Sequence, residues 1–214
     1  GRAAFEEIKE EEILRQIVKL FRYIHSKDVF EFYGRNFLAR RILMAKSRIE
    51  IEQQFIALLR AECGGEYTSK MEAMVSDHER RLAPTMGEME FSCTVCTKGV
   101  WPTMELKSGL SLPPAMAQAI AGFEDMYSAR FSGRKLSWVF SEGWGEVTGI
   151  FRDTKYTFCV STMQMLILSG FVQGASKKDY LSLVRANLLV EVSGEYRVNE
   201  DFSSKTRYVK IPQV

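Results

Sequence analysis

The first third of the chain carries a helical repeat of apolar residues. Apolar side chains recur every three or four positions over residues 5–25, which places these six on one helix face: Ile8, Ile13, Ile17, Leu20, Phe21 and Ile24. Three further amphipathic helices are expected to open at Asp28, Ser47 and Ser69, each of which precedes a glutamate by three residues, as in a helix-capping pair. Because the predicted connections are short, the pattern favours an up-and-down four-helix bundle.

Beyond Pro84 the period changes from that of a helix to that of a strand. Residues 89–97 alternate between apolar and polar, and a helix is expected over 112–131. Three strand-like runs then follow at residues 134–140, 145–151 and 155–161. Short turns separate these runs, so an antiparallel meander is expected.

The end of the chain contains the parts of a small winged-helix-like segment. Two short helices are expected over 161–171 and 176–187, the first capped by Ser161 and the second by Ser176 paired with Asp179. A hairpin with a Ser193-Gly194 turn of type I′ or II′ follows. The predicted fold class is α+β, a helical bundle followed by a mixed α/β domain with an antiparallel meander and a shortened winged-helix-like end. The predicted parts are a bundle over 1–83, an α/β domain over 84–160, and a segment over 161–214 that completes the α/β part.

Composition narrows the class of protein. The 214 residues include 29 Lys and Arg against 27 Asp and Glu, and residues 1–82 carry 15 basic and 14 acidic residues. Without a concentrated basic face, nucleic acid is an unlikely partner. No apolar run is long enough for a membrane span, and four cysteines are too sparse for a disulfide scaffold. An intracellular, reducing location is therefore expected.

The candidate catalytic and metal-binding residues are few. Cys93 and Cys96 have the CxxC spacing of zinc and redox sites, but residues three apart in a strand point to opposite faces, and no second ligand pair exists. His25 is expected to cap the end of the first helix, where a partial positive charge meets the helix carbonyls, and His78 is expected to lie solvated at a helix end. No nucleophile elbow, phosphate loop or HExxH motif occurs. The sequence therefore predicts no catalytic residues, no metal and no cofactor.

Six ordered blocks resemble one known family. They are LFRYIHSKDVFEFYGRNFLARRIL (20–43), ECGGEYTSKMEAMVSD (62–77), TKGVWP (97–102), FSGRKLSW (131–138), YTFCVSTMQMLIL (156–168) and NEDFSSKTRYVKI (199–211). Together they resemble the C-terminal homology region of the cullin family over almost the whole chain. The resemblance implies a four-helix bundle followed by an α/β domain, in agreement with the periodicity.

The resemblance also implies a function. Cullins are non-catalytic scaffolds of ubiquitin ligases, whose C-terminal region takes a strand of a RING-box protein into its sheet. The RING-box protein in turn recruits a ubiquitin-conjugating enzyme, and adaptors bind regions that are not in this chain. A location in cytoplasm and nucleus is expected. Strands 89–97 and 134–140 are expected to border the site, with Trp101 and Trp138 as anchors. The predicted site residues are Phe91, Cys93, Val95, Trp101, Arg134, Lys135 and Trp138.

The sequence differs from the cullin family in two respects, and alternative interpretations of the site and of the function remain. The stretch between Phe171 and Tyr180 is shorter than in cullins, and the chain stops at Val214, before the domain whose lysine accepts a ubiquitin-like modifier. The chain is thus an excised segment or a divergent short protein. The site residues could instead only hold the domain together, with Pro102 among them. A cullin-like subunit of the anaphase-promoting complex and a winged-helix nucleic-acid-binding protein are the alternative functions.

Overall fold

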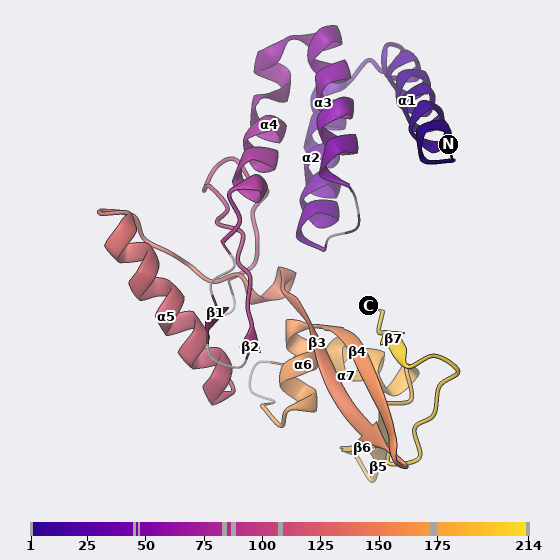
Figure 1. Cartoon of the computed structure of the whole chain (residues 1–214), viewed down its shortest axis with the longest axis vertical. Helices are drawn as coiled ribbons and strands as arrows, with labels where there is room; N and C mark the ends of the chain where they lie inside the picture. The colour runs from indigo at the N-terminus through magenta and orange to yellow at the C-terminus, as the bar shows by residue number, and fades with distance from the viewer. Residues whose placement is uncertain are drawn as a thin grey trace. The chain divides into compact units, whose positions relative to one another are not determined.

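The chain forms two compact units that alternate along the sequence. The computed structural model (Figure 1) describes residues 2–44, 46, 48–82, 85–86, 89–106, 109–171 and 175–212. The first, helical unit spans residues 1–83 and 92–103, and the second, α/β unit spans residues 84–91 and 104–214. The chain therefore leaves the helical unit, enters the α/β unit and returns before it finally crosses over.

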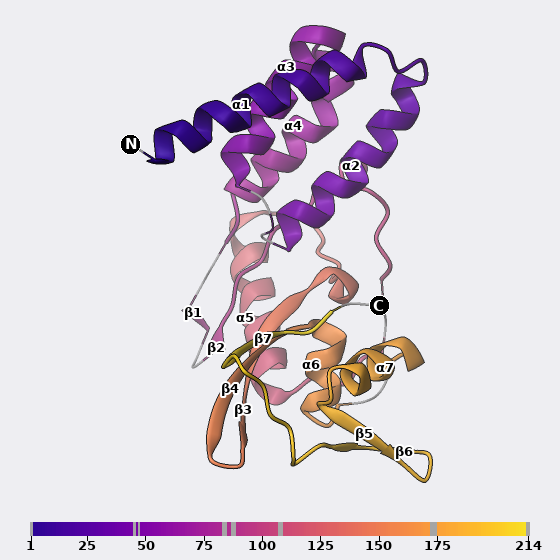
Figure 2. The ribbon, with the colours of Figure 1, turned by 90° about the vertical axis from the view of Figure 1, so that its right-hand side faces the viewer.

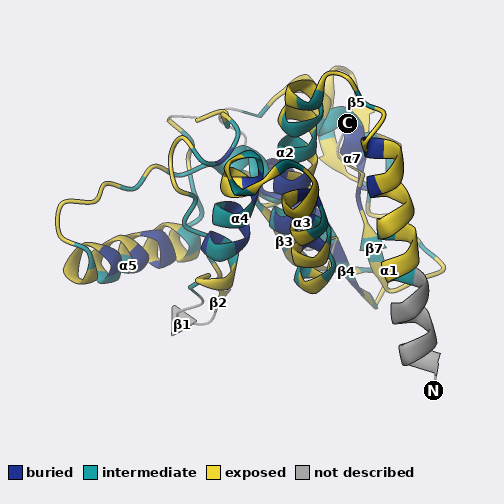
Figure 3. Ribbon diagram, turned by 90° about the horizontal axis from the view of Figure 1, so that it is seen from above, coloured by how far each residue is buried: buried dark blue, intermediate teal, exposed yellow. Residues whose placement is uncertain are grey.

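Four helices build the helical unit, as the apolar periodicity predicts. Helix α4 packs against α2 and α3, and α1 packs against α3. Their inward faces are buried (Figure 3), and the largest fully buried side chains include Phe21, Leu59 and Met74. The helices are α1 (Arg2–Phe21), α2 (Lys27–Leu43), α3 (Ile49–Cys63) and α4 (Gly65–Glu79).

The predicted starts of these helices are wrong in two places. Helix α2 begins after Ser26 rather than Asp28, and α4 begins after Gly64 rather than Ser69. Gly64 has a φ of +87°, a conformation that glycine adopts without strain, so α3 passes into α4 without a loop. Ser69 consequently lies inside α4, where its hydroxyl donates to the Glu66 carbonyl at 2.9 Å. The predicted cap at Ser47 lies outside the described residues.

The α/β unit contains a three-stranded sheet and three helices. Strands β3 and β4 pair antiparallel over their full lengths, and β7 joins the free edge of β4 in parallel orientation. Helix α6 packs against β3, β4 and α7. The elements are β1 (Thr85–Met86), β2 (Met89–Glu90), α5 (Pro114–Arg130), β3 (Trp144–Phe151), β4 (Thr154–Ser161), α6 (Thr162–Leu168), α7 (Lys177–Arg185), β5 (Leu189–Val192), β6 (Glu195–Val198) and β7 (Tyr208–Lys210).

The predicted three-stranded antiparallel meander is wrong. Its last two strands are β3 and β4, but residues 134–139 form no strand and a 3-10 turn follows at Phe140–Glu142. The Trp138 indole donates a hydrogen bond to Glu124 of α5 at 2.7 Å, which holds this segment against a helix instead of a sheet. The strand predicted over 89–97 is reduced to β2, followed by one isolated bridge between Cys93 and Leu82.

Local signals at the end of the chain are confirmed. Ser161 forms a capping box with Gln164 at α6, and Ser176 forms one with Asp179 at α7. The turn between β5 and β6 has positive φ at both Ser193 (54°) and Gly194 (84°), as a type I′ turn requires. Within the described residues, no helix combines the length and apolarity needed to cross a bilayer.

Aromatic rings form the centre of the α/β core. Phe158 on β4 is 2% exposed, and its ring lies 5.8 Å from that of Phe151 and 5.3 Å from that of Phe202. The opposite face of the sheet carries Ile150, which is 72% exposed. Alternation along β3 and β4 thus separates a buried face from a solvated one.

Replacing the central ring should destabilise the α/β unit strongly. Phe158→Ala removes buried apolar surface and leaves a cavity, so we expect a loss of about 3–5 kcal/mol in the free energy of unfolding. Urea denaturation followed by circular dichroism measures this loss. The control is Ile150→Ala on the solvated face, which should change stability by no more than about 0.5 kcal/mol. Equal effects of the two substitutions would contradict the assigned faces.

Candidate partner-binding site

The structure divides the predicted partner-binding residues between the two units. Cys93, Val95 and Trp101 belong to the helical unit. Phe91, Arg134, Lys135 and Trp138 belong to the α/β unit. Each group belongs to its own unit, and a site that joins the two groups remains a prediction.

Trp101 is held by a buried carboxylate that the sequence analysis did not single out. Its indole nitrogen donates to Asp77 Oδ2 at 2.8 Å, and Asp77 is only 6% exposed. Asp77 also accepts from the backbone nitrogen of Thr97 at 2.9 Å and from its hydroxyl at 3.1 Å. The available signal was the position of Asp77 three residues after Met74, which places a carboxylate on the buried stripe of α4.

A second helix holds the same loop from another side. Arg35 of α2 donates to the backbone carbonyl of Val100 at 3.3 Å, and its Nε lies 3.3 Å from a carboxylate oxygen of Glu31. The Arg35 side chain is only 13% exposed. Residues 97–101 are thus fixed to α4 through Asp77 and to α2 through Arg35.

The two thiols of the CxxC pair are half-buried and poorly suited to nucleophilic chemistry. Burial raises the pKa of Cys93 to about 11. Burial, and then the nearby charges of Asp77 and Cys93, raise the pKa of Cys96 to about 12. Both thiols are therefore protonated near neutral pH, and the thiolate is the reactive form. Among the described residues, no three His, Cys, Asp or Glu side chains gather as a metal site would require.

In the α/β unit, Trp138 lies in an aromatic cluster on α5. Its ring centroid is 5.6 Å from that of Phe123 and 6.1 Å from that of Phe91. Glu124 accepts its indole hydrogen, so the polar atom of Trp138 is already paired. Arg134 and Lys135 are exposed, and the Arg134 guanidinium lies 4.8 Å from the centre of the Phe131 ring.

The backbone between these side chains is left open. Over the described part of the chain, no hydrogen bond engages the backbone N–H or C=O groups of residues 135–139. Arg134 N–H makes only a long bond of 3.4 Å to the Phe131 carbonyl. Backbone groups without a partner in the chain have to bind water or another molecule. This segment therefore offers a row of unused donors and acceptors.

His78 differs from its predicted solvated state. It is half-buried near the end of α4, and its Nδ1 is buried without a hydrogen-bond partner among the described residues. Loss of hydration lowers the pKa of His78 below its ordinary value, and the charge of Arg81 lowers the pKa further against the opposing effect of Glu79. The neutral form is thus favoured in the folded chain.

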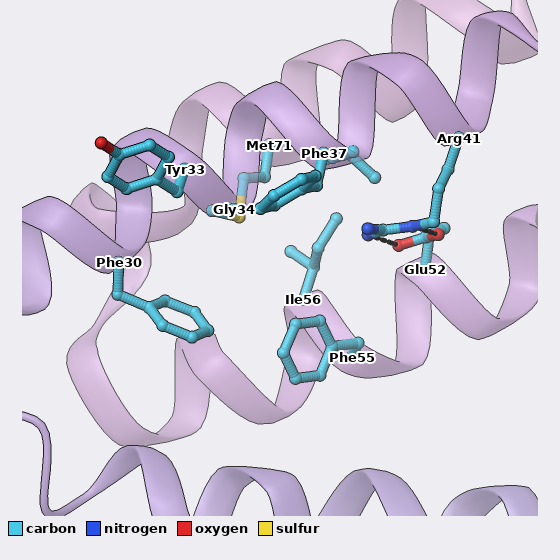
Figure 4. A pocket seen from close by; sticks show the side chains of 10 residues that line it. Phe30, Tyr33, Gly34, Phe37, Arg41, Glu52, Phe55, Ile56 and Met71 are labelled. Atoms are coloured by element: carbon cyan, nitrogen blue, oxygen red, sulfur yellow. Dashed lines mark hydrogen bonds and ion pairs between the residues drawn. The ribbon is translucent and has the colours of Figure 1, made fainter.

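The helical unit also contains an apolar pocket of about 240 Å³ (Figure 4). Its two sides come from α2 and α3, and the bidentate ion pair between Arg41 and Glu52 lies at one end. The arginine nitrogens are 2.6 and 2.8 Å from the carboxylate oxygens of Glu52, which is 4% exposed. The apolar lining consists of Phe30, Tyr33, Phe37, Leu38, Phe55, Ile56 and Met71, beside Gly34.

Comparison with known proteins decides the family. Residues 1–81 match the cullin alpha solenoid domain, and residues 95–193 match the cullin alpha+beta domain. The chain belongs to the cullin family. It is 35% identical to cullin-4A of Mus musculus over 179 residues, 77% of this chain and 23% of that protein. It is 34% identical to cullin-1 of Caenorhabditis elegans over 78% of this chain and 23% of that protein. It is also 34% identical to cullin-3B of Arabidopsis thaliana over 74% of this chain and 23% of that protein.

These matches fit the fold but cover only part of each relative. The helical unit contains the matched alpha solenoid segment, and the α/β elements lie mainly within the second matched segment. The chain spans about a quarter of the length of the curated cullins that it matches. The predicted α+β fold class and the predicted cullin membership are therefore confirmed.

Removing the Asp77 carboxylate should loosen the loop that carries Trp101. In the cullin chain, Asp77→Ala leaves the Trp101 indole and the Thr97 amide without their acceptor. We expect a loss of about 2–4 kcal/mol in the free energy of unfolding, because the buried donors would have given up their hydrogen bonds to water without gaining an acceptor in the protein. Urea denaturation and tryptophan fluorescence measure the loss. Asp125→Ala, at an exposed site on α5, is the control and should change stability by less than about 0.5 kcal/mol.

His78 should make the stability of the chain depend on pH in weakly acidic solution. Its folded-state pKa lies below the ordinary value of 6.5, so the unfolded chain binds the proton first as the pH falls. Stability should be complete above about pH 7 and decline as the pH falls through the unfolded pKa. Urea midpoints at about pH 7.5 and about pH 5.5 measure the decline. His78→Gln should flatten it, whereas His25→Gln, at an exposed site, should not; identical slopes would refute the assignment.

Proposed function

We propose that this chain is a non-catalytic scaffold segment of a cullin-RING ubiquitin ligase and binds a RING-box protein by strand addition. Family membership supports the scaffold role. The observation that carries the binding mode is the backbone of residues 135–139, whose donors and acceptors have no partner among the described residues. The bound RING-box protein would then position a ubiquitin-conjugating enzyme, in the cytoplasm and nucleus.

Strand addition suits this segment for two physical reasons. The partner strand supplies main-chain hydrogen bonds in a regular row, which is what the segment lacks. Trp138 is already fixed to α5 through Glu124 and Phe123, so the backbone beside it is held in place before the partner arrives. A preordered segment loses less conformational entropy on binding than a free one. Lys135 is exposed beside this backbone and is available to the partner's side chains.

The decisive experiment is co-expression with a RING-box protein, followed by size-exclusion chromatography with mass determination. A one-to-one complex that disappears when the N-terminal strand of the RING-box protein is deleted supports the proposal. A well-behaved monomer that ignores the RING-box protein refutes it. The chain needs no catalytic group for this role, so a reducible ubiquitin adduct on one of its cysteines would also refute the scaffold assignment.

A backbone substitution tests the strand itself. Ser137→Pro removes one N–H donor from the middle of the open segment, whereas Ser137→Ala removes only the exposed hydroxyl. We expect the proline variant to weaken RING-box binding at least about tenfold and the alanine variant to bind normally. Calorimetric titration measures the affinities, and circular dichroism verifies that both variants fold. Normal binding by a folded Ser137→Pro variant would place the partner elsewhere.

A further inference from the structure

Three basic side chains gather where the open backbone segment of the α/β unit begins. Arg130 is the last residue of α5, and Arg134 and Lys135 follow after a short turn. All three are exposed, and none of them forms an ion pair with a residue that the structure describes. Residues 126–141 contain these three basic residues and no acidic one. Arg130, Arg134 and Lys135, here called the basic cluster, therefore carry a charge that the neighbouring sequence does not neutralise.

Both arginines of the cluster pack near one aromatic ring. The guanidinium carbon of Arg134 lies 4.8 Å from the centre of the Phe131 ring, and that of Arg130 lies 5.4 Å from it. Gly133, which has a φ of +77°, turns the chain between the two arginines, and the Arg134 N–H donates to the Phe131 carbonyl at 3.4 Å. A guanidinium beside a ring is partly ordered, yet its N–H donors stay available to an anion.

The acidic residues closest to the cluster in the sequence leave its charge in place. Glu124 accepts the Trp138 indole hydrogen at 2.7 Å, and Asp125 is exposed on α5. Glu142 ends the 3-10 turn that follows the open backbone. In the described part of the chain, none of these three carboxylates forms an ion pair with the basic cluster.

A stabilising role in the helix accounts for only one member of the cluster. Arg130 interacts favourably with the carbonyl groups at the C-terminal end of α5. Arg134 and Lys135 lie beyond the helix, where this interaction has faded. Like charges held around one ring also repel each other. A negatively charged partner would remove this repulsion, so the cluster has the properties of a binding surface.

We propose that the basic cluster binds an acidic segment of the RING-box protein, next to the strand that pairs with residues 135–139. This inference rests on the proposed function, because it concerns the electrostatic part of the same site. Lys135 is both a member of the cluster and the first residue of the open backbone. A strand paired along this backbone therefore brings one of its ends to the cluster. An aspartate or glutamate at that end can accept two N–H donors from a single guanidinium.

The surface combines two features that together favour an acidic peptide. The guanidinium donors suit a carboxylate, and the row of backbone N–H and C=O groups at residues 135–139 suits the main chain of a strand. A nucleic acid offers phosphates to the first feature but no regular main chain to the second. Because the cluster is exposed, its charge should act mainly on the rate of association and should be screened by salt.

Charge reversal tests the acidic contact. The Arg130→Glu/Arg134→Glu variant should bind the RING-box protein at least about tenfold more weakly at about 0.05 M salt, and its association rate should lose most of its salt dependence. Calorimetry and stopped-flow fluorescence measure these changes, and circular dichroism verifies the fold. The matched control is Lys177→Glu/Lys178→Glu, which reverses two exposed charges on α7. Helix α7 lies apart from α5 in both views (Figures 1 and 2), so the control should bind as the wild type does.

The possible results separate this inference from the proposed function. If the RING-box protein binds the wild-type chain and the double arginine variant equally at every salt concentration, the acidic contact is wrong and strand addition is unaffected. If the control variant loses as much affinity as the arginine variant, the effect belongs to net charge and the assigned cluster is wrong. A RING-box protein that does not bind the wild-type chain refutes both proposals.

A zero-length cross-link tests the position of the acidic segment. In the complex, a water-soluble carbodiimide should join the Lys135 amine to an aspartate or glutamate next to the RING-box strand, as mass spectrometry of the digested product would show. Lys135→Arg keeps the charge, so this variant should bind normally and lose the cross-link. A complex in which Lys135 forms no cross-link, or links only to a carboxylate far from the strand, contradicts the proposal.

Discussion

A buried carboxylate determines how the chain returns to its first unit. Residues 84–91 belong to the α/β unit, and residues 92–103 belong again to the helical unit. Asp77 binds this returning segment through the Thr97 amide, the Thr97 hydroxyl and the Trp101 indole. Burying a carboxylate without donors is costly, so the donors of the loop, together with Arg80 of α4, stabilise the buried Asp77. The same returning segment is also held by Arg35 of α2 through the Val100 carbonyl and by the bridge between Leu82 and Cys93.

The α/β unit uses an aromatic anchor for a similar purpose. Trp138 packs against Phe123 and donates to Glu124, both on α5. These contacts take the place of the strand pairing that the alternation of apolar and polar residues at 134–140 would favour. Because residues 135–139 are held through the Trp138 side chain, their backbone N–H and C=O groups have no hydrogen-bond partner among the described residues. Exposed backbone N–H and C=O groups without hydrogen-bond partners can pair with a strand of another chain. The same anchor therefore explains both the absence of a strand at 134–139 and the suitability of this segment for a partner strand.

Structural features that depend on a few neighbouring residues could be predicted from the sequence, whereas contacts between residues far apart in the sequence could not. The four helices, the capping boxes at Ser161 and Ser176, and the Ser193-Gly194 turn each follow from local periodicity or local hydrogen bonding. The strand predicted at 134–140 failed because alternate apolar residues also suit a segment that packs one side against a helix. The helix start predicted at Ser69 failed because Gly64 permits a direct passage from α3 to α4. The position of Asp77 on the buried stripe of α4 is a local signal, but its contacts with Thr97 and Trp101 join residues far apart in sequence, as does the pocket between α2 and α3.

The two open surfaces of the chain differ in what they require of a partner. The backbone at residues 135–139 needs directional hydrogen bonds, which any strand supplies through its main chain, and side chains add selectivity. The pocket between α2 and α3 is lined mainly by apolar side chains, so burial of apolar surface is what it offers to an occupant. The surfaces also lie in different units, so each can be disabled without changing the chemistry of the other. The polar character of the one surface and the apolar character of the other are therefore independent properties of this cullin segment.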